Sequence, residues 1–330
     1  MNKIKFLSVF FLLLLNPIFT PEQTKEVKKT ESFFLTRYKY NNRIGLKNKG
    51  LSFNGDSSLP TLTNPETESL AQTLFEHYLK KQPVLTFPND LSLKQAETIQ
   101  KKLVKLLIPS QGQLIGYKAG LTNQKIQEKF KVSQPVLGRI LKQMILPSGV
   151  TLPPNFAAIP RLEGDLIVRV KSEGINQAKT PQEILKNLDA IIPFLELPDL
   201  VYTKDLELNG AMLVAVNVGA RLGIVGTPIL LQSTEKWQNK LNNIQVIIVD
   251  QSGQELAQGH SKNLLGDPLK VVLWIKDKLH SQGKSLKKGD LLSLGSITPV
   301  IPIKPGTTIY GQYLGLNPDK KIEISVNFKN

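Results

Sequence analysis

Hydrophobic residues are spaced in two different ways along the chain. Between residues 64 and 130 apolar side chains recur every three or four positions, which is typical of amphipathic helices. After residue 152 they come in short runs bounded by Gly, Pro, Asn and Asp, which is typical of strands. The pattern therefore predicts a small helical N-terminal domain over residues 64–151 and a β-rich domain over residues 152–330. Together they form an α+β protein with a mixed β-sandwich or roll, rather than a doubly wound sheet.

Capping residues mark where the predicted helices begin. Asn64 followed by Pro65 predicts a helix that runs to about Lys81. The capping box Ser92-Leu-Lys-Gln95 begins a second helix, and a short third helix follows Thr122. In the β-rich part we expect helices after Thr180 and Asp267, and strands in the runs 157–159, 166–170, 212–216, 244–249, 291–294 and 322–328.

The first residues have the pattern of a secretory leader. Lys3 and Lys5 precede an apolar run over residues 6–19, which is too short to span a bilayer comfortably. We therefore predict a signal peptide or N-terminal anchor in residues 1–20 and an exported protein, periplasmic or tethered to a membrane. The alternative is a buried N-terminal helix in a cytoplasmic protein.

The positive charge of the chain is partly concentrated next to this segment. The formal net charge is +15, and residues 25–50 carry eight Lys or Arg against two Glu. Residues 21–63 lack apolar periodicity and predict a basic, flexible tether. The rest of the charge is spread over a large surface, so we expect no nucleic-acid partner. The absence of cysteine excludes disulfides and thiolate metal sites.

Three carboxylates are the strongest candidates for chemistry. Glu163 and Asp165 lie two residues apart in a predicted strand, so their side chains point to the same face. A hard cation such as Mg²⁺ would relieve their repulsion, whereas the alternative is an exposed polar face of an edge strand. Glu196 stands in an otherwise apolar segment, residues 191–199, where a carboxylate is costly unless it is paired or binds a metal.

An ordered series of short motifs resembles a known family. The series contains Gly116-Tyr-Lys-Ala-Gly-Leu-Thr122, Gln134-Pro-Val-Leu-Gly138, Arg161-Leu-Glu-Gly-Asp165, Pro193-Phe-Leu-Glu196, Val214-Ala-Val-Asn217 and Leu265-Gly-Asp-Pro-Leu269. It is similar to the fumarylacetoacetate hydrolase superfamily, in the branch of 2-keto-4-pentenoate hydratases, 2-oxohepta-3-ene-1,7-dioate hydratases and 4-oxalocrotonate decarboxylases. The resemblance covers about residues 66–329.

This resemblance implies a site and a reaction. The metal ligands of the family fall on Glu163, Asp165 and Glu196, with Mg²⁺ or Mn²⁺ as cofactor, and its catalytic lysine falls on Lys118. The implied substrate is a small 2-oxo or 2-hydroxydienoic acid, which a hydratase converts through a metal-stabilised enolate. Lys118 would neutralise the substrate carboxylate or move a proton. We also expect a homo-oligomer.

Several positions depart from the family pattern. Asp165 stands for a Glu, Val136 and Val216 stand for acids, and Asp267 stands for a His. The metal ligands are kept, but polar groups that would handle water are fewer. The alternatives to a hydratase are therefore a decarboxylase, a C–C hydrolase, or a catalytically impaired relative that binds a metal or a carboxylate.

Overall fold

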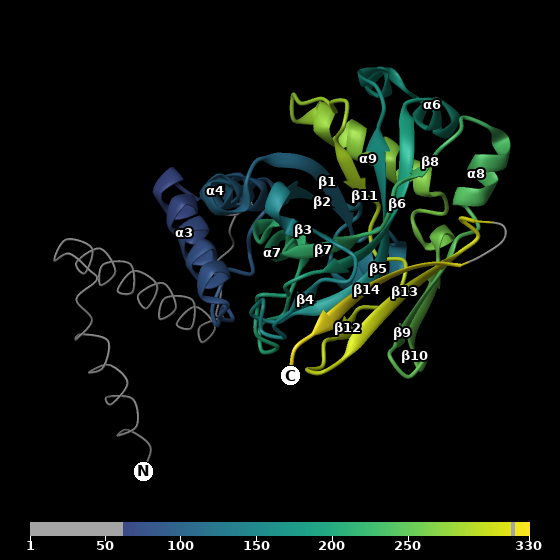
Figure 1. Ribbon diagram of the computed structural model, residues 1–330. Coiled ribbons are helices and arrows are strands. Elements are labelled where there is room, and N and C mark those ends of the chain that lie inside the picture. Colours follow the sequence, from purple (N-terminus) through teal and green to yellow (C-terminus); the bar gives the residue numbers. More distant parts are fainter. Residues whose placement is uncertain (1–61, 318–320) are drawn as a thin grey trace, which may run out of the picture. The chain divides into compact units, whose positions relative to one another are not determined.

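The computed structural model describes residues 62–317 and 321–330, drawn in colour in Figure 1. The predicted leader, residues 1–20, and the predicted tether up to residue 61 lie outside the described residues. The described residues form one compact unit. Within the described part, no helix combines the length and the hydropathy needed to cross a membrane.

Two helices at the start of this unit pack side by side (Figure 1). They are α3 (Asn64–Lys80) and α4 (Leu93–Gln111), and both begin with a capping box. In α3 the N-cap is Thr63, one residue before the predicted Asn64, because its hydroxyl accepts from the backbone N–H of Glu66 while the Glu66 side chain accepts from Thr63. Their apolar faces form one cluster that contains Leu70, Leu74, Ile99 and Leu103.

A third helix in this cluster corrects one prediction. The run 212–216, predicted as a strand, lies almost entirely in α7 (Gly210–Ala215). Asn209 caps the helix by accepting from the backbone N–H of Met212, and α7 packs on α4. Every residue of α7 is buried, so the segment has no polar face that would show a helical period.

The larger sheet carries nine strands. Its main order is β2 (Val136–Leu141), β1 (Leu114–Gly120), β11 (Leu291–Ser293), β5 (Arg161–Val170), β6 (Leu188–Leu197), β7 (Leu222–Val225) and β3 (Ile145–Pro147). β12 (Ile301–Pro302) pairs with β5, and β8 (Ile229–Leu230) pairs with β6. The pairs β1–β11 and β3–β7 are parallel, whereas the other pairs in this sheet are antiparallel.

A second sheet packs against the first and encloses the main core. It runs β10 (Glu255–His260), β9 (Gln245–Asp250), β13 (Thr308–Leu314), β14 (Ile322–Phe328) and β4 (Thr151–Leu152). Contacts of β5 with β9 and of β6 with β13 and β14 join the two sheets around Leu166, Leu195, Val246 and Ile324. The predicted strands at 166–170, 244–249, 291–294 and 322–328 are confirmed, whereas residues 157–159 form bends.

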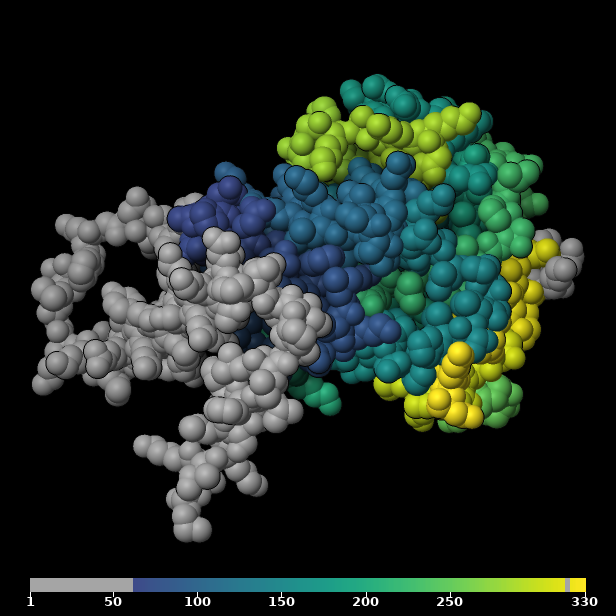
Figure 2. Space-filling view, turned by 60° about the vertical axis from the view of Figure 1, so that its left-hand side comes forward, coloured from purple at the N-terminus to yellow at the C-terminus, as the bar shows by residue number. Residues whose placement is uncertain are grey.

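Shorter helices complete the unit. They are α5 (Gln124–Lys129), α6 (Pro181–Lys186), α8 (Glu235–Leu241), α9 (Pro268–Ser281), and the 3-10 turns η2 (Lys142–Met144), η3 (Glu173–Gln177), η4 (Asn217–Gly219) and η5 (Ser261–Asn263). Thr180 and Asp267 cap α6 and α9 as predicted. α9 contacts β1, and in Figure 2 its yellow-green atoms adjoin the blue atoms of the segment that contains α4 and β1.

The predicted fold class is confirmed, because helices and two curled sheets share one α+β architecture. The strands β1, β2 and β3 come from residues 114–147, yet they belong to the same sheet as β5, β6, β7 and β11. The larger sheet therefore contains strands from both predicted domains. The division into domains 64–151 and 152–330 stays a prediction.

Candidate active site

Strands β5 and β6 bring the three predicted carboxylates into one region. Glu163 lies directly opposite Glu196 in the antiparallel register, and Asp165 lies opposite Phe194. Glu163 and Asp165 share a face of β5 because side chains alternate along a strand. The exposed fractions of Glu163, Asp165 and Glu196 are 8%, 0% and 3%. The carboxylates are therefore not the exposed polar face that was the alternative for this strand.

Burial and like charge act together on these acids. Burial raises the pKa of Glu163 well above its ordinary value, and the nearby Glu196 raises it further. Burial likewise raises the pKa of Asp165, with Glu196 as the next cause. The region therefore disfavours several negative charges at once in the absence of a cation.

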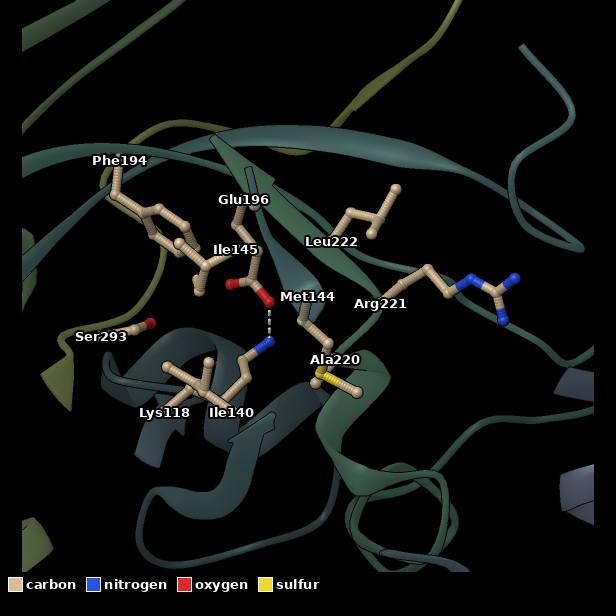
Figure 3. A pocket seen from close by; sticks show the side chains of 11 residues that line it. Lys118, Ile140, Met144, Ile145, Phe194, Glu196, Ala220, Arg221, Leu222 and Ser293 are labelled. Atoms are coloured by element: carbon tan, nitrogen blue, oxygen red, sulfur yellow. Dashed lines mark hydrogen bonds and ion pairs between the residues drawn. The ribbon is translucent and has the colours of Figure 1, made fainter. Parts of the chain in front are cut away.

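Lys118 supplies one positive charge to this region. Its ammonium forms an ion pair with Oε1 of Glu196, and both side chains are buried. The same Nζ donates to the backbone carbonyl of Val218 at 2.9 Å. Figure 3 shows Lys118 and Glu196 facing each other across the pocket. β1 and β6 thus contribute the two partners of a buried pair that is 78 residues apart in the sequence.

A glycine makes room for the Lys118 side chain. Gly138 on β2 lies opposite Lys118 on β1, and a Cβ at Gly138 would lie 2.7 Å from Lys118 Cγ and 2.9 Å from the carbonyl oxygen of Asn217. Any larger residue here would have to move the lysine or the backbone of η4. The presence of glycine at the end of the motif Gln134-Pro-Val-Leu-Gly138 therefore has a steric explanation.

The backbone that receives Lys118 is in an unusual conformation. Asn217, Val218 and Gly219 have φ angles of 58°, 57° and 67°, and all three residues are buried. A β-branched residue with positive φ is rare and costs free energy, so surrounding contacts must hold it. The Asn217 side chain does this by accepting from the N–H of Arg139 at 2.8 Å and donating to its carbonyl at 2.9 Å. These two hydrogen bonds hold η4 in the conformation in which the carbonyl of Val218 accepts from Lys118.

Ser293 on β11 forms a hydrogen bond with the third carboxylate, Asp165. Its hydroxyl donates to Oδ2 of Asp165, and the backbone N–H of Leu166 donates to Oδ1 at 2.5 Å. Both hydrogen bonds lower the pKa of Asp165 and so oppose part of the effect of burial. Ser293 and Asn217 were not among the predicted site residues. The signals for them were a polar residue inside the apolar run 291–294 and the Asn that ends Val214-Ala-Val-Asn217.

A small pocket opens beside the Lys118–Glu196 pair. Lys118, Glu196 and Ser293 are polar residues of its lining, and the other side chains around it are mostly apolar (Figure 3). The lining also contains Ile140, Met144, Ile145, Phe194, Ala220, Arg221, Leu222 and Gly223. A lining of this kind offers a few polar groups among apolar contacts, as is usual for small-molecule sites.

The residues present fit a divalent cation. Among the described residues, Oε2 of Glu196 is a buried oxygen with no hydrogen-bond partner. Such an orphaned oxygen, beside carboxyl groups whose pKa values are raised, has the hard donor character that Mg²⁺ and Mn²⁺ prefer. Within residues 62–317 and 321–330 no three acidic or histidine side chains converge as a complete metal site, and Oε1 of Glu196 is paired with Lys118 instead. The roles of Glu163, Asp165, Glu196 and Lys118 therefore stay predictions, supported by their shared location.

Curated relatives share most of the length of this chain, although no family model matches it. A 2-keto-4-pentenoate hydratase from Paraburkholderia xenovorans strain LB400 is 25% identical over 250 residues, which cover 74% of this chain and 90% of the relative. A 4-oxalocrotonate decarboxylase from a Pseudomonas species is 24% identical over 230 residues, covering 70% and 86%.

Solved structures share the fold. The 4-oxalocrotonate decarboxylase from Pseudomonas putida G7, complexed with magnesium and adipate, superposes with a TM-score of 0.72 at 21% identity, covering 82% of this chain and 100% of that one. The same enzyme complexed with calcium and acetate gives a TM-score of 0.71. In this fold, and in sequence along most of its length, the chain is similar to the branch of the fumarylacetoacetate hydrolase superfamily that contains 2-keto-4-pentenoate hydratases and 4-oxalocrotonate decarboxylases, which supports the predicted resemblance.

Proposed function

We propose that this protein is a divalent-metal-dependent hydratase that acts on a small 2-hydroxydienoic or 2-oxo acid. The observation that carries the proposal is the buried group formed by Glu163, Glu196 and Lys118, in which Oε2 of Glu196 has no hydrogen-bond partner among the described residues. If the Lys118–Glu196 ion pair served only to stabilise the fold, it would not require a second buried glutamate, Glu163, opposite Glu196. The relatives named as hydratases and decarboxylases support an enzyme of this general kind.

Glu163, Asp165 and Glu196 would hold Mg²⁺ or Mn²⁺. The magnesium complex of the structural relative supports this choice of metal. When bound, such a cation supplies positive charge that stabilises the negative charge developing on the 2-oxygen of the substrate. Ser293 would keep Asp165 in position through its hydrogen bond to Oδ2.

Lys118 would orient the substrate and move a proton. An ammonium has three N–H donors, and the described residues accept two of them, at Glu196 and at the carbonyl of Val218. The third N–H is then available to the carboxylate or the reacting oxygen of a ligand. The apolar walls keep bulk water away from this donor, which strengthens its interaction with an anionic substrate.

Decarboxylation is the second candidate. Apolar surroundings disfavour a carboxylate more than neutral carbon dioxide, and the pocket beside Glu196 is mostly apolar. The structural relative with a TM-score of 0.72 is also a decarboxylase. The two reactions need the same stabilised intermediate charge but give different products, so product analysis separates them.

The direct test uses the full chain, 2-hydroxypenta-2,4-dienoate and added Mg²⁺. We expect the dienoate absorbance to fall, a product heavier by one water, and loss of turnover with EDTA or with Glu163→Gln. Glu255→Gln is the matched control, because Glu255 is an exposed carboxylate on β10 in the other sheet. Turnover that survives both EDTA and Glu163→Gln would overturn the proposal, and release of carbon dioxide from a 2-oxo diacid without hydration would favour the second candidate.

A further inference from the structure

We propose that Thr298 is a positioning residue for the metal ligands and acts through the backbone of Gly164, the residue between Glu163 and Asp165. This inference rests on the proposed function, since it concerns how the chain holds the ligands that the cation would bind. It goes beyond that function because Thr298 contacts the peptide backbone between two ligands rather than a carboxylate. The Thr298 side chain is itself buried.

One side of β5 is only partly paired where it carries these ligands. β11 pairs with β5 as far as Ile167, and β12 pairs with it again at Leu162. Residues 163–166 lie between the two pairings and face the segment 294–300, which forms no strand. The backbone of β5 therefore depends here on individual hydrogen bonds from that segment.

Both backbone groups of Gly164 bond to this segment. The N–H of Gly164 donates to Oγ1 of Thr298 at 2.9 Å, and its carbonyl accepts from the N–H of Ile297 at 2.9 Å. The Thr298 hydroxyl thus replaces the backbone carbonyl that the next strand of a regular sheet would offer. The same hydroxyl donates to the carbonyl of Pro299 at 3.2 Å, so its donor and an acceptor site are both used.

The two hydrogen bonds of Gly164 orient the peptide groups that join it to the two ligands. A peptide group is planar, so the orientation of the one before Gly164 sets ψ of Glu163, and the orientation of the one after it sets φ of Asp165. Together with the neighbouring backbone, these dihedral angles determine the direction in which each carboxylate side chain leaves the strand. A change at Thr298 should therefore move Glu163 without altering its carboxylate chemically.

The segment that carries Thr298 is held by other parts of the fold. Nδ2 of Asn263 on η5 donates to the carbonyl of Ile297 at 3.2 Å, and Gly259 on β10 lies so close to that carbonyl that a Cβ would overlap it. A Cβ at Gly164 would lie 3.1 Å from Cγ2 of Thr298, so the threonine methyl packs directly on β5. β10 and η5 therefore place the hydroxyl independently of the carboxylates.

The first test removes the Thr298 hydroxyl and uses a similar hydroxyl elsewhere as control. Thr298→Ala and Ser261→Ala each remove a buried oxygen that accepts from a backbone N–H, since Ser261 accepts from Ile244 at 3.1 Å. Electron paramagnetic resonance during Mn²⁺ titration of the full chain measures affinity, and urea unfolding measures stability. We expect both variants to lose stability, and only Thr298→Ala to bind Mn²⁺ about tenfold more weakly. Wild-type affinity in Thr298→Ala, or an equal loss in Ser261→Ala, would overturn the inference.

Two further variants separate the hydroxyl from the packing of the side chain. Thr298→Val keeps the shape and loses the hydroxyl, whereas Thr298→Ser keeps the hydroxyl and loses the methyl. We expect the valine variant to lose about tenfold in Mn²⁺ affinity and the serine variant to stay within about twofold of the wild type. The reverse order would assign the effect to packing and overturn the inference while the proposed function stands. A wild-type chain that binds no Mn²⁺ would overturn both.

Discussion

Glu163 and Glu196 lie directly opposite each other on two antiparallel strands, with both side chains buried. Like charges in such a cross-strand pair are destabilising, and burial adds to that cost. Lys118 compensates only one of the two negative charges, on the Oε1 side of Glu196. This uncompensated charge is the reason for proposing that the site binds a second cation.

The metal-free protein should lose stability as the pH rises. The pKa values of Glu163 and Asp165 are raised on folding, so the folded state holds more protons than the unfolded state above the ordinary values of 4.5 and 3.8. This contribution is fully present below the ordinary values and disappears as the pH passes through the raised ones. With EDTA present, urea unfolding should therefore give a lower free energy of unfolding at about pH 8 than at about pH 5.5.

Glu163→Gln is the control for this pH dependence, because glutamine does not titrate. Its unfolding free energy should fall less steeply over the same interval. A wild-type protein that becomes more stable between these two pH values, with the same slope in Glu163→Gln, would contradict the assignment of the raised pKa values.

Replacing Lys118 should remove turnover without removing the fold of the sheet. In Lys118→Met the aliphatic part of the side chain is retained and the N–H donors are lost. We expect turnover of the dienoate to fall by about 100-fold or more, which is the range for losing a proton-transferring group. Steady-state kinetics measure this loss, and circular dichroism checks the fold. Wild-type turnover in this variant would show that Lys118 only balances the charge of Glu196.

Ser293→Ala should weaken metal binding while leaving all three carboxylates in place. The hydroxyl donates to Oδ2 of Asp165, and residues that orient a metal ligand typically change affinity by about tenfold or more. Ser296→Ala is the matched control, because its hydroxyl donates instead to the backbone carbonyl of Thr298. Calorimetric titration with Mn²⁺ compares the two. Equal affinities would show that Ser293 does not position Asp165 for a metal.

Gly138→Ala tests how tightly the lysine is placed. The added methyl would lie 2.7 Å from Lys118 Cγ, so the side chain or η4 must shift. A displacement of this order at a reacting group should lower turnover by about tenfold to 100-fold, with little change in metal affinity. The measurement is turnover together with Mn²⁺ affinity. Unchanged turnover would mean that Lys118 adapts freely to its surroundings.

The helix starts and the face of the carboxylates could be predicted because they depend on neighbouring residues. The capping boxes at Ser92 and Thr180 satisfy backbone N–H groups within one turn, so four residues are enough to recognise them. The shared face of Glu163 and Asp165 follows from the alternation along one strand. Local rules of this kind need no knowledge of the rest of the fold.

The partners of the site depend on topology, which local patterns do not carry. Ser293 reaches Asp165 only because β11 pairs with β5, and Lys118 reaches Glu196 only because β1 enters the same sheet. The helix α7 was missed for another reason, since a short segment buried on all sides shows no period. The leader in residues 1–20, export or membrane tethering, and the homo-oligomer stay predictions.

The central claim is that Glu163, Asp165 and Glu196 form one divalent-metal site, and Mn²⁺ binding to the full chain tests it most directly. Electron paramagnetic resonance measures free Mn²⁺ during the titration, with Glu196→Gln compared against the exposed control Glu255→Gln. We predict one tight site per chain in the wild type and in Glu255→Gln, and at least a roughly 100-fold weaker site in Glu196→Gln. Equal Mn²⁺ binding by Glu196→Gln and the wild type would contradict the account.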